Sequence, residues 1–528
     1  MKAYSIKEWK NGWLLLLGLF IASSCSDLDV TALGQLSDSN FPQTEEDAVA
    51  LANAVYYPNV RISTALGYVF DLTTELEANA EQENSGGDLL GRMKWDPSNS
   101  YVATVWQNLY EIVTRANDVV DKVGEATDLR RRLSGEARFL RAYAYFYLVQ
   151  GWGEVPLVLH NAEAADALRE DVEVVYGQIV EDLEYAASVL PAAAEYGNTD
   201  KGRATKGAAL AYLAKVYLVW GQTSKNTGAA KERYTKSVEY ANQVTGYALE
   251  EVFLDNWNNN NRNGKEAIFS VQHLQGQYAA GDGGNHLAHC AFVGGFSNNS
   301  LPHVYATSDK WYEDFDDADQ RKRGTYLKEY TFSEDQGSFK AGETFTFDRV
   351  RYRKYIDTTQ VAGGYAANTR DINRTVIRYA EVLLLKAEAI NERDGGPNAE
   401  AYTAINQVRR RAFRQPLNTP SALADLSAGL DYAGFKAAIQ QERVFELTYE
   451  QNRWTDLVRW RIFVKTVKEA VTNGWIESKY EKQNVKQHYY RFPIPKAQRD
   501  INPELWQNYG YDGYDESKTG ANPYAGFE

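Results

Sequence analysis

Cysteine is scarce in this chain, with only Cys25 and Cys290 among its 528 residues. If Cys25 is used in another covalent bond, Cys290 has no partner and no intramolecular disulfide can form. Stability must then come from packing, for which a hydrophobic content of 44% is sufficient. A chain of this length exceeds the usual size of one core, so subdomains or a repeat architecture are expected.

Positive charge is also in deficit, with 57 Lys and Arg against 71 Asp and Glu and a formal net charge of −14. An acidic chain is a poor partner for nucleic acid or for anionic lipid surfaces, because like charges repel. Familiar catalytic motifs are missing: the sequence has no nucleophile elbow, no H-E-x-x-H and no phosphate-binding loop. A glycoside hydrolase is not excluded, since it needs only two suitably spaced carboxylates and acids are plentiful.

The apolar run at 13–22 is too short to cross a bilayer, which takes about 20 residues. Three lysines precede it, and the small residues Ala22, Ser23 and Ser24 mark its end, a pattern typical of a secretory signal peptide. The next residue, Cys25, resembles the cysteine of a bacterial lipobox, where the chain is cleaved and the thiol acylated. We therefore expect a signal peptide at 1–24 and a lipid anchor and tether at 25–43. An ordinary signal peptide with an incidental cysteine is the alternative.

Apolar residues recur at helical spacing over much of the chain. Helices are predicted at about 104–124, 135–150, 172–190, 204–220, 231–244, 376–413 with a break at 395–397, 432–449 and 451–468. The stretch from Ala208 to Val244 resembles a tetratricopeptide repeat, with two helices that cross at small residues. The segments 60–100, 250–375 and 470–528 are instead rich in Gly, Asn, Asp and aromatic residues, with a short strand predicted at 267–271.

The predicted fold class is therefore mostly α. Tetratricopeptide-like helix pairs at about 104–244 and 376–468 form a scaffold within a folded domain at 44–528. An irregular, loop-rich second lobe comes from about 60–100 and 250–375, and long loops of this kind usually carry function.

Several short motifs occur in a fixed order behind the cysteine. They are WQNLY at 106–110, GEARFLRA at 135–142, GEVPL at 153–157, GRAT at 202–205, RYAEVLL at 378–384, RWTDLVRW at 453–460 and PIP at 493–495. Together they resemble the SusD/RagB family of Bacteroidetes outer-membrane lipoproteins over nearly the whole mature chain.

The resemblance implies a helical protein that binds nutrients, usually oligosaccharides, at the cell surface. It implies a position as a lid over a SusC-like TonB-dependent transporter, and it does not imply catalysis. The acids that follow Cys25 resemble the surface-export context of such lipoproteins, which places the lipid in the outer membrane facing the medium. Some relatives capture peptides, and a helical scaffold that binds only protein is a further alternative.

Sugar binding needs flat aromatic faces and polar groups at the ring edge. In relatives the platform comes from the segment before the first long helix and from the central irregular region. Carried over by region, this predicts Trp95 as the stacking residue and Asp71 as a hydroxyl partner. Further candidates are Phe292, Phe296 and Tyr305. Core packing is the alternative for any one aromatic residue, and for Trp311 it is the preferred interpretation.

Charged residues on predicted helical faces have a structural interpretation. The residues concerned are Arg138, Arg141, Glu442, Arg443 and Arg459. Because a buried charge must be paired, we expect them to fix helix packing and not to contact ligand.

Two clusters could suggest a metal ion. The aspartates between Asp314 and Asp319 offer oxygens for calcium, but they lack the glycine and the terminal Glu of an EF-hand, so a solvated acidic turn is expected. His286, His289 and Cys290 could suggest zinc, but no fourth ligand is evident. No metal site and no cofactor are therefore predicted.

Overall fold

The computed structural model describes residues 41–79, 83–224, 226–274, 304–331, 340–355, 372–519 and 522–528. The chain divides into two compact units, Met1–Gln43 and Thr44–Glu528, and the second contains the elements described below. Within the described ranges, no helix combines the length and apolar character needed to cross a bilayer. The signal segment and Cys25 lie outside the described residues, so both remain predictions.

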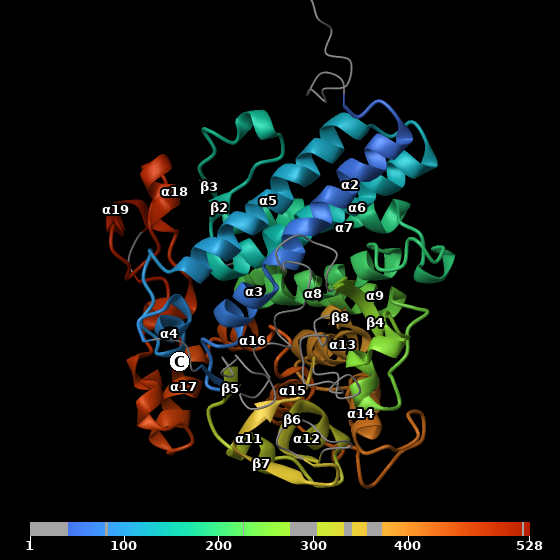
Figure 1. Ribbon diagram of the computed structural model, residues 1–528, viewed down its shortest axis with the longest axis vertical. Coiled ribbons are helices and arrows are strands. Elements are labelled where there is room, and N and C mark those ends of the chain that lie inside the picture. The colour runs from blue at the N-terminus through green and yellow to red at the C-terminus, as the bar shows by residue number, and fades with distance from the viewer. Residues whose placement is uncertain are drawn as a thin grey trace, which may run out of the picture. The chain divides into compact units, whose positions relative to one another are not determined.

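The first group of helices is an array in which neighbours in sequence pack together (Figure 1). It comprises α2 (Glu45–Arg61), α5 (Ser100–Val123), α6 (Asp128–Trp152), α7 (Val172–Val189), α8 (Lys206–Thr223) and α9 (Ala230–Gln243). Helix α5 packs on α2 and α6, and contacts continue from α6 to α7, α8 and α9 in turn. Side chains of Asn99, Thr127 and Thr205 accept amide hydrogen bonds at the starts of α5, α6 and α8. The five helices predicted between 104 and 244 are confirmed, although α6 begins earlier, at its Thr127 cap.

The second group packs on the first through α13, which contacts both α8 and α9. Its members are α13 (Tyr379–Asp394), α14 (Ala399–Ala412), α15 (Tyr432–Leu447), α16 (Arg453–Arg459) and α17 (Phe463–Thr472). The prediction of one helix at 451–468 is wrong, because the chain turns between α16 and α17. Arg461 adopts a left-handed φ of 62°, and the Ile462 amide donates to the Leu457 carbonyl oxygen at 3.0 Å. A left-handed residue of this kind ends a helix. The sequence suggested a single helix because the apolar pattern continues across the turn.

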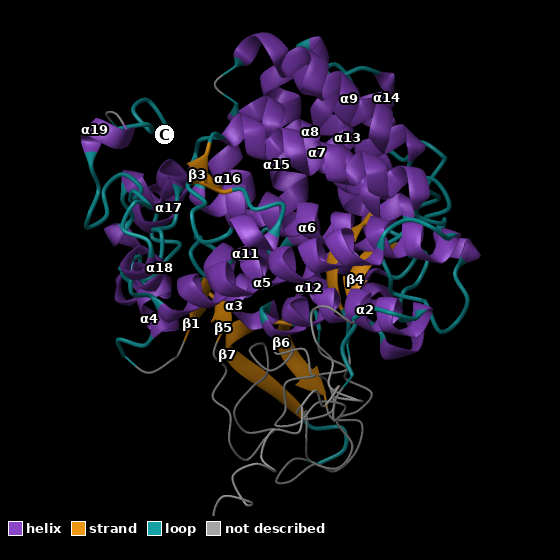
Figure 2. Ribbon diagram, turned by 90° about the horizontal axis from the view of Figure 1, so that it is seen from above, coloured by secondary structure: helices purple, strands orange, loops and turns teal. Residues whose placement is uncertain are grey.

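Short elements make up the irregular second lobe. Its helices, with those of the C-terminal segment, are α3 (Ser63–Phe70), α4 (Gly86–Gly91), α11 (Lys310–Glu313), α12 (Gln320–Thr325), α18 (Lys496–Ile501) and α19 (Glu516–Thr519). The described strands form two-stranded antiparallel sheets: β1 (Glu77–Asn79) with β5 (Val304–Ala306), β2 (Val155–Pro156) with β3 (Arg169–Glu170), β4 (Ala267–Val271) with β8 (Arg374–Arg378), and β6 (Tyr326–Thr331) with β7 (Thr344–Tyr352). Figure 2 shows β6 and β7 projecting from a body that is otherwise mainly helical. The mostly α fold class and the strand at 267–271 are confirmed.

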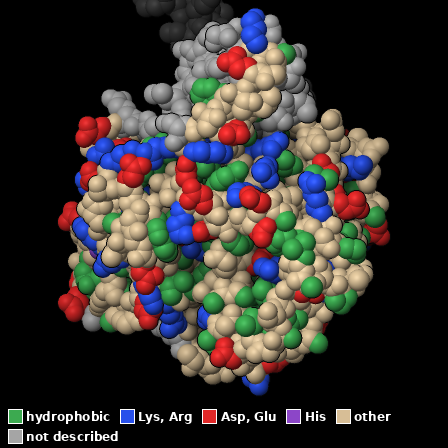
Figure 3. Space-filling model, turned by 90° about the horizontal axis from the view of Figure 1, so that it is seen from below, with side chains coloured by type: hydrophobic (Ala, Val, Ile, Leu, Met, Phe, Trp, Pro, Cys, Tyr) green, Lys and Arg blue, Asp and Glu red, His purple; other side chains and the backbone are tan. Residues whose placement is uncertain are grey.

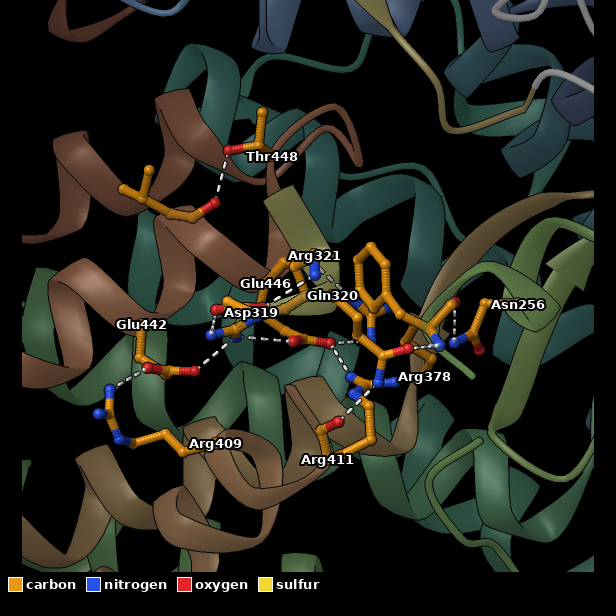
Figure 4. A network of polar contacts seen from close by, with 12 residues as sticks. Asn256, Asp319, Gln320, Arg321, Arg378, Arg409, Arg411, Glu442, Glu446 and Thr448 are labelled. Carbon is orange, nitrogen blue, oxygen red and sulfur yellow. Dashed lines mark hydrogen bonds and ion pairs between the residues drawn. The ribbon is translucent and has the colours of Figure 1, made fainter. Parts of the chain in front are cut away.

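Part of the interior is filled by paired charges (Figure 4). One oxygen of the Glu446 carboxylate accepts from Arg378 and Arg411, and the other accepts from Arg321 at 3.0 Å. Burial raises the pKa of Glu446, but the three arginines lower it by more, so it lies well below its ordinary value. This carboxylate is therefore ionised and holds β8, α12 and α14 against α15.

The charged residues selected from the sequence follow the same rule. Arg138 and Arg141 pair with Asp182, Arg443 with Asp456, Arg459 with Glu388, and Glu442 with Arg321 and Arg409. The prediction that they fix helix packing is confirmed, since each pair joins different parts of the chain.

Candidate ligand-binding site

Trp95 is nearly buried and so differs from the open sugar platform that was predicted, although it is among the residues that line a second cavity of about 400 Å³. Its side chain is only 2% exposed, and its indole N–H donates to the Tyr511 hydroxyl at 2.9 Å. The ring stacks on Tyr489 with centroids 3.9 Å apart. Two aromatic residues from the C-terminal segment thus cover most of the Trp95 ring.

Asp71 is also buried, at 2% exposure, and its carboxylate accepts a hydrogen bond from the Gln451 amide at 2.7 Å. Burial raises the pKa of this carboxyl to about 7. The predicted role as a hydroxyl partner is corrected accordingly, because the group faces the protein interior.

Tyr305 is half-buried on β5, and the remaining candidates Phe292 and Phe296 lie outside the described residues. The Tyr305 hydroxyl donates to the Asn79 carbonyl oxygen at 3.3 Å, and the centroids of the Tyr305 and Tyr480 rings are 5.9 Å apart. It packs against the same small buried cluster as Trp475. Tyr305 therefore supports the wall of the cavity described next.

A cavity of about 340 Å³ is lined by three half-buried aromatic residues, Trp311, Phe445 and Trp475; we call it the tryptophan pocket. Its polar lining comes from Glu75, Lys310, Asp314, Gln441, Arg453 and Thr466. Three consecutive helices, α15, α16 and α17, supply most of it, and α11 and the residues just before β1 complete it. Apolar faces beside a few polar groups are the usual composition of a small-ligand site.

Trp311 is held through Thr307, the residue just after β5. The indole N–H donates to Thr307 Oγ1 at 2.9 Å, and the Thr307 hydroxyl donates to the Glu75 carbonyl oxygen at 2.6 Å. The Thr307 amide donates to the Leu76 carbonyl oxygen at 2.9 Å, which extends the β1–β5 pairing. Trp311 partly packs on the core, as expected, but it also lines the pocket.

Trp475 is placed by the end of α17. Gly474 adopts a left-handed φ of 70°, and the Trp475 amide then donates to the Ala470 carbonyl oxygen at 2.9 Å. The Trp311 and Trp475 rings meet at 84° with centroids 5.9 Å apart. The two indoles therefore form nearly perpendicular walls of the pocket.

The charged groups of the pocket form two pairs. Arg453 donates to the Glu75 carboxylate from Nε at 2.8 Å, and Lys310 pairs with Asp314 one helical turn away. Lys310 Nζ also lies 4.9 Å from the centroid of Trp475, a cation–π distance. Both cations therefore have carboxylate partners within the protein.

Sequence reasoning missed Phe445 and Trp475. The available signal was the Gly-Trp pair directly after an amphipathic helix, because a glycine at that position fixes the direction of the next side chain. No local signal marks Phe445, which lies on a helix among residues that pack inward.

The acidic stretch between Asp314 and Asp319 is used in ion pairs. Asp314 pairs with Lys310, Asp317 with Lys322, and the buried Asp319 with Arg321. In the described part of the chain, no group of three or more His, Cys, Asp or Glu side chains is placed to hold a metal ion. His286, His289 and Cys290 are outside that part.

Comparison with known proteins finds matches over most of the folded unit at 44–528. A model described as the SusD family matches residues 218–511, more than half of the chain. The chain belongs to the SusD family. A second model, described as starch-binding associating with outer membrane, matches residues 42–218. The predicted family is confirmed.

The individual relatives have low sequence identity to this SusD family member, but their alignments cover most of both chains. SusD-like protein P2 of Formosa agariphila is 27% identical over 492 residues, which cover 87% of this chain and 91% of that protein. The starch-binding protein SusD of Bacteroides thetaiotaomicron is 24% identical, with 82% of each chain covered. The crystal structure of a SusD homolog from Bacteroides thetaiotaomicron matches with a TM-score of 0.78 at 24% identity, over 89% of this chain and 98% of that one. This match shows that the fold is shared.

Proposed function

We propose that this protein captures oligosaccharide in the tryptophan pocket and passes it to a SusC-like TonB-dependent transporter. The main observation behind this proposal is that the half-buried indoles of Trp311 and Trp475 lie at 84° to each other, beside the charged residues and the Thr466 hydroxyl of the pocket lining. Aromatic faces with polar groups at their edges suit the two kinds of surface on a sugar ring. The family description and the starch-binding relative support glycan as the ligand class.

Binding is favoured over hydrolysis at this pocket. A glycoside hydrolase needs one carboxyl group as acid and a second as base or nucleophile. Both carboxylates that line the pocket, Glu75 and Asp314, are instead held in ion pairs. Sugar released from glycan by the pure protein would contradict a purely binding role.

Titration calorimetry over a panel of oligosaccharides tests the proposal. Trp475→Ala should weaken binding by roughly tenfold or more, because the sugar loses an aromatic face. Trp506→Ala is the matched control: Trp506 is half-buried and contacts Arg169, and it does not line the pocket. Equal losses of glycan affinity in Trp475→Ala and Trp506→Ala would contradict the proposal that the tryptophan pocket binds the glycan. A response to peptides alone would favour the peptide-capturing alternative.

Membrane attachment and delivery form the second part of the proposal. We expect lipid on Cys25 to hold the protein at the outer membrane, facing the medium. Cys25→Ala should abolish labelling by a fatty-acid analogue and release the protein from the cell surface. Retention in full amount would count against the anchor, and failure to co-purify with a SusC-like transporter would count against delivery.

A further inference from the structure

We propose that the tryptophan pocket selects uncharged oligosaccharides and excludes glycans that carry carboxylate or sulfate groups. The inference rests on the proposed function and specifies its ligand class. It follows from the charge balance of the pocket and from the hydrogen-bonding state of Glu75 and Arg453.

The four charged side chains of the lining are Glu75, Lys310, Asp314 and Arg453, two of each sign. Arg453 donates to Glu75 from both Nε and Nη2, at 2.8 and 2.5 Å. Lys310 is bound to Asp314 and also lies over the Trp475 ring. An anionic sugar would therefore find no cation in excess, and it would lose hydration without compensation.

Glu75 adds a direct bias against anions. Its side chain is only 2% exposed, and Oε1 accepts both hydrogen bonds from Arg453. Oε2 is buried and has no hydrogen-bond partner among the described residues. A carboxylate oxygen in this state attracts a donor and repels a second anion.

Arg453 supplies the complementary donor. Its Nη1 makes no hydrogen bond to any described residue, its side chain is 12% exposed, and Arg453 is among the residues that line the pocket. A hydroxyl group can accept a hydrogen bond from this nitrogen and remains neutral beside the buried Glu75 carboxylate. A carboxylate or sulfate would bring a full negative charge to the same position, where the Glu75 carboxylate repels it.

The wider surface does not supply the missing positive charge. The chain carries a formal net charge of −14. On the face shown in Figure 3, basic and acidic side chains are interspersed among the described residues and do not form separate fields. Long-range attraction therefore does not favour an anionic glycan.

Calorimetry with two sets of hexasaccharides at about 0.15 M salt tests the inference, a condition that screens distant charges. The neutral set contains malto-, cello-, xylo- and manno-oligosaccharides, and the anionic set contains oligogalacturonate, oligoalginate and chondroitin sulfate fragments. We expect binding in the neutral set alone. Anionic binding that Trp475→Ala abolishes would overturn the inference while leaving the pocket in place. Silence in both sets would overturn the proposed function and the inference with it.

A variant with an added positive charge tests whether the charge balance of the pocket excludes anionic glycans. Gln441 is exposed on α15 at the pocket lining, and Gln441→Arg would add a cation without an assigned carboxylate partner. The ratio of anionic to neutral affinity should rise by roughly tenfold over the matched Gln441→Met control. An unchanged ratio would contradict charge balance as the basis of exclusion.

The Glu75→Gln variant tests the carboxylate itself. It should raise the ratio of anionic to neutral affinity by roughly fivefold or more, because the negative charge that repels an anion is removed. Circular dichroism would establish that this variant is folded, and Gln441→Arg provides the test if it is not. A folded Glu75→Gln protein with wild-type affinity and selectivity would overturn the role of Glu75.

Discussion

The indole N–H of Trp311 donates a hydrogen bond of 2.9 Å to the hydroxyl oxygen of Thr307. The same hydroxyl donates to the Glu75 carbonyl oxygen at 2.6 Å, so one threonine orients an aromatic wall and the strand beside it. Thr307 is 1% exposed and does not line the pocket, which makes it a positioning residue.

Thr307→Val should remove both hydrogen bonds and leave the Trp311 ring less firmly oriented. We expect the free energy of unfolding to fall by about 1–3 kcal/mol, the usual cost of leaving buried polar groups unsatisfied. Glycan affinity should fall as well. Urea denaturation and calorimetry measure the two effects, and Thr307→Ser, which keeps the hydroxyl, should resemble wild type. Valine and serine variants with the same affinity would contradict the positioning role.

Trp95→Ala should act on stability. The ring is buried, stacks on Tyr489 and donates to the Tyr511 hydroxyl, so its removal should lower the free energy of unfolding by about 3–5 kcal/mol, as for other large core truncations. Urea denaturation of Trp95→Ala beside Trp475→Ala separates the roles, because the latter should lose mainly affinity. If Trp95→Ala lost glycan binding with an unchanged midpoint, the sugar platform predicted from sequence would be restored.

Gly474→Ala should disturb the pocket through the backbone alone. Nothing lies within 4 Å of an added Cβ, but the left-handed φ of 70° costs a non-glycine residue about 1–2 kcal/mol. We expect a loss of that size in the free energy of unfolding, together with weaker glycan binding as Trp475 shifts. Gly396 provides the control, because its Cβ would also meet nothing and its φ is not positive. Equal effects at both glycines would argue against the role of the α17 terminus.

Asp71→Asn should change how stability depends on pH. The folded protein keeps the Asp71 proton to a pKa of about 7, because burial disfavours the carboxylate, whereas the ordinary value is 3.8. Between these values the folded state binds more protons than the unfolded chain, so this group lowers stability as the pH rises, by up to about 1.4 kcal/mol per pH unit. The free energy of unfolding of wild type minus that of Asp71→Asn should therefore fall from pH 4 to 7 and then level off. Parallel curves over this window would show that Asp71 does not titrate in this way.

The helical scaffold and its paired charges were predictable from the sequence, since both depend on local or general rules. The stripe of apolar residues in α5 and its Asn99 cap are adjacent in the chain, so spacing alone identifies the helix. Arg459 could be expected to have a partner because a buried guanidinium requires one, although its partner Glu388 was not predictable. The ordered motifs likewise identified the family that the comparisons confirm.

The choice of aromatic residues for the pocket depends on tertiary structure alone. Trp95 and Trp475 are the same residue type in two irregular segments, and although a glycine precedes Trp475, no local pattern shows which of the two rings becomes buried. Trp95 is covered by Tyr511, 416 positions later in the chain, whereas Trp475 is brought beside Trp311 by the turn that ends α17. Burial of a side chain depends on what packs over it, and for a pocket made from distant segments that information arises only when the chain folds.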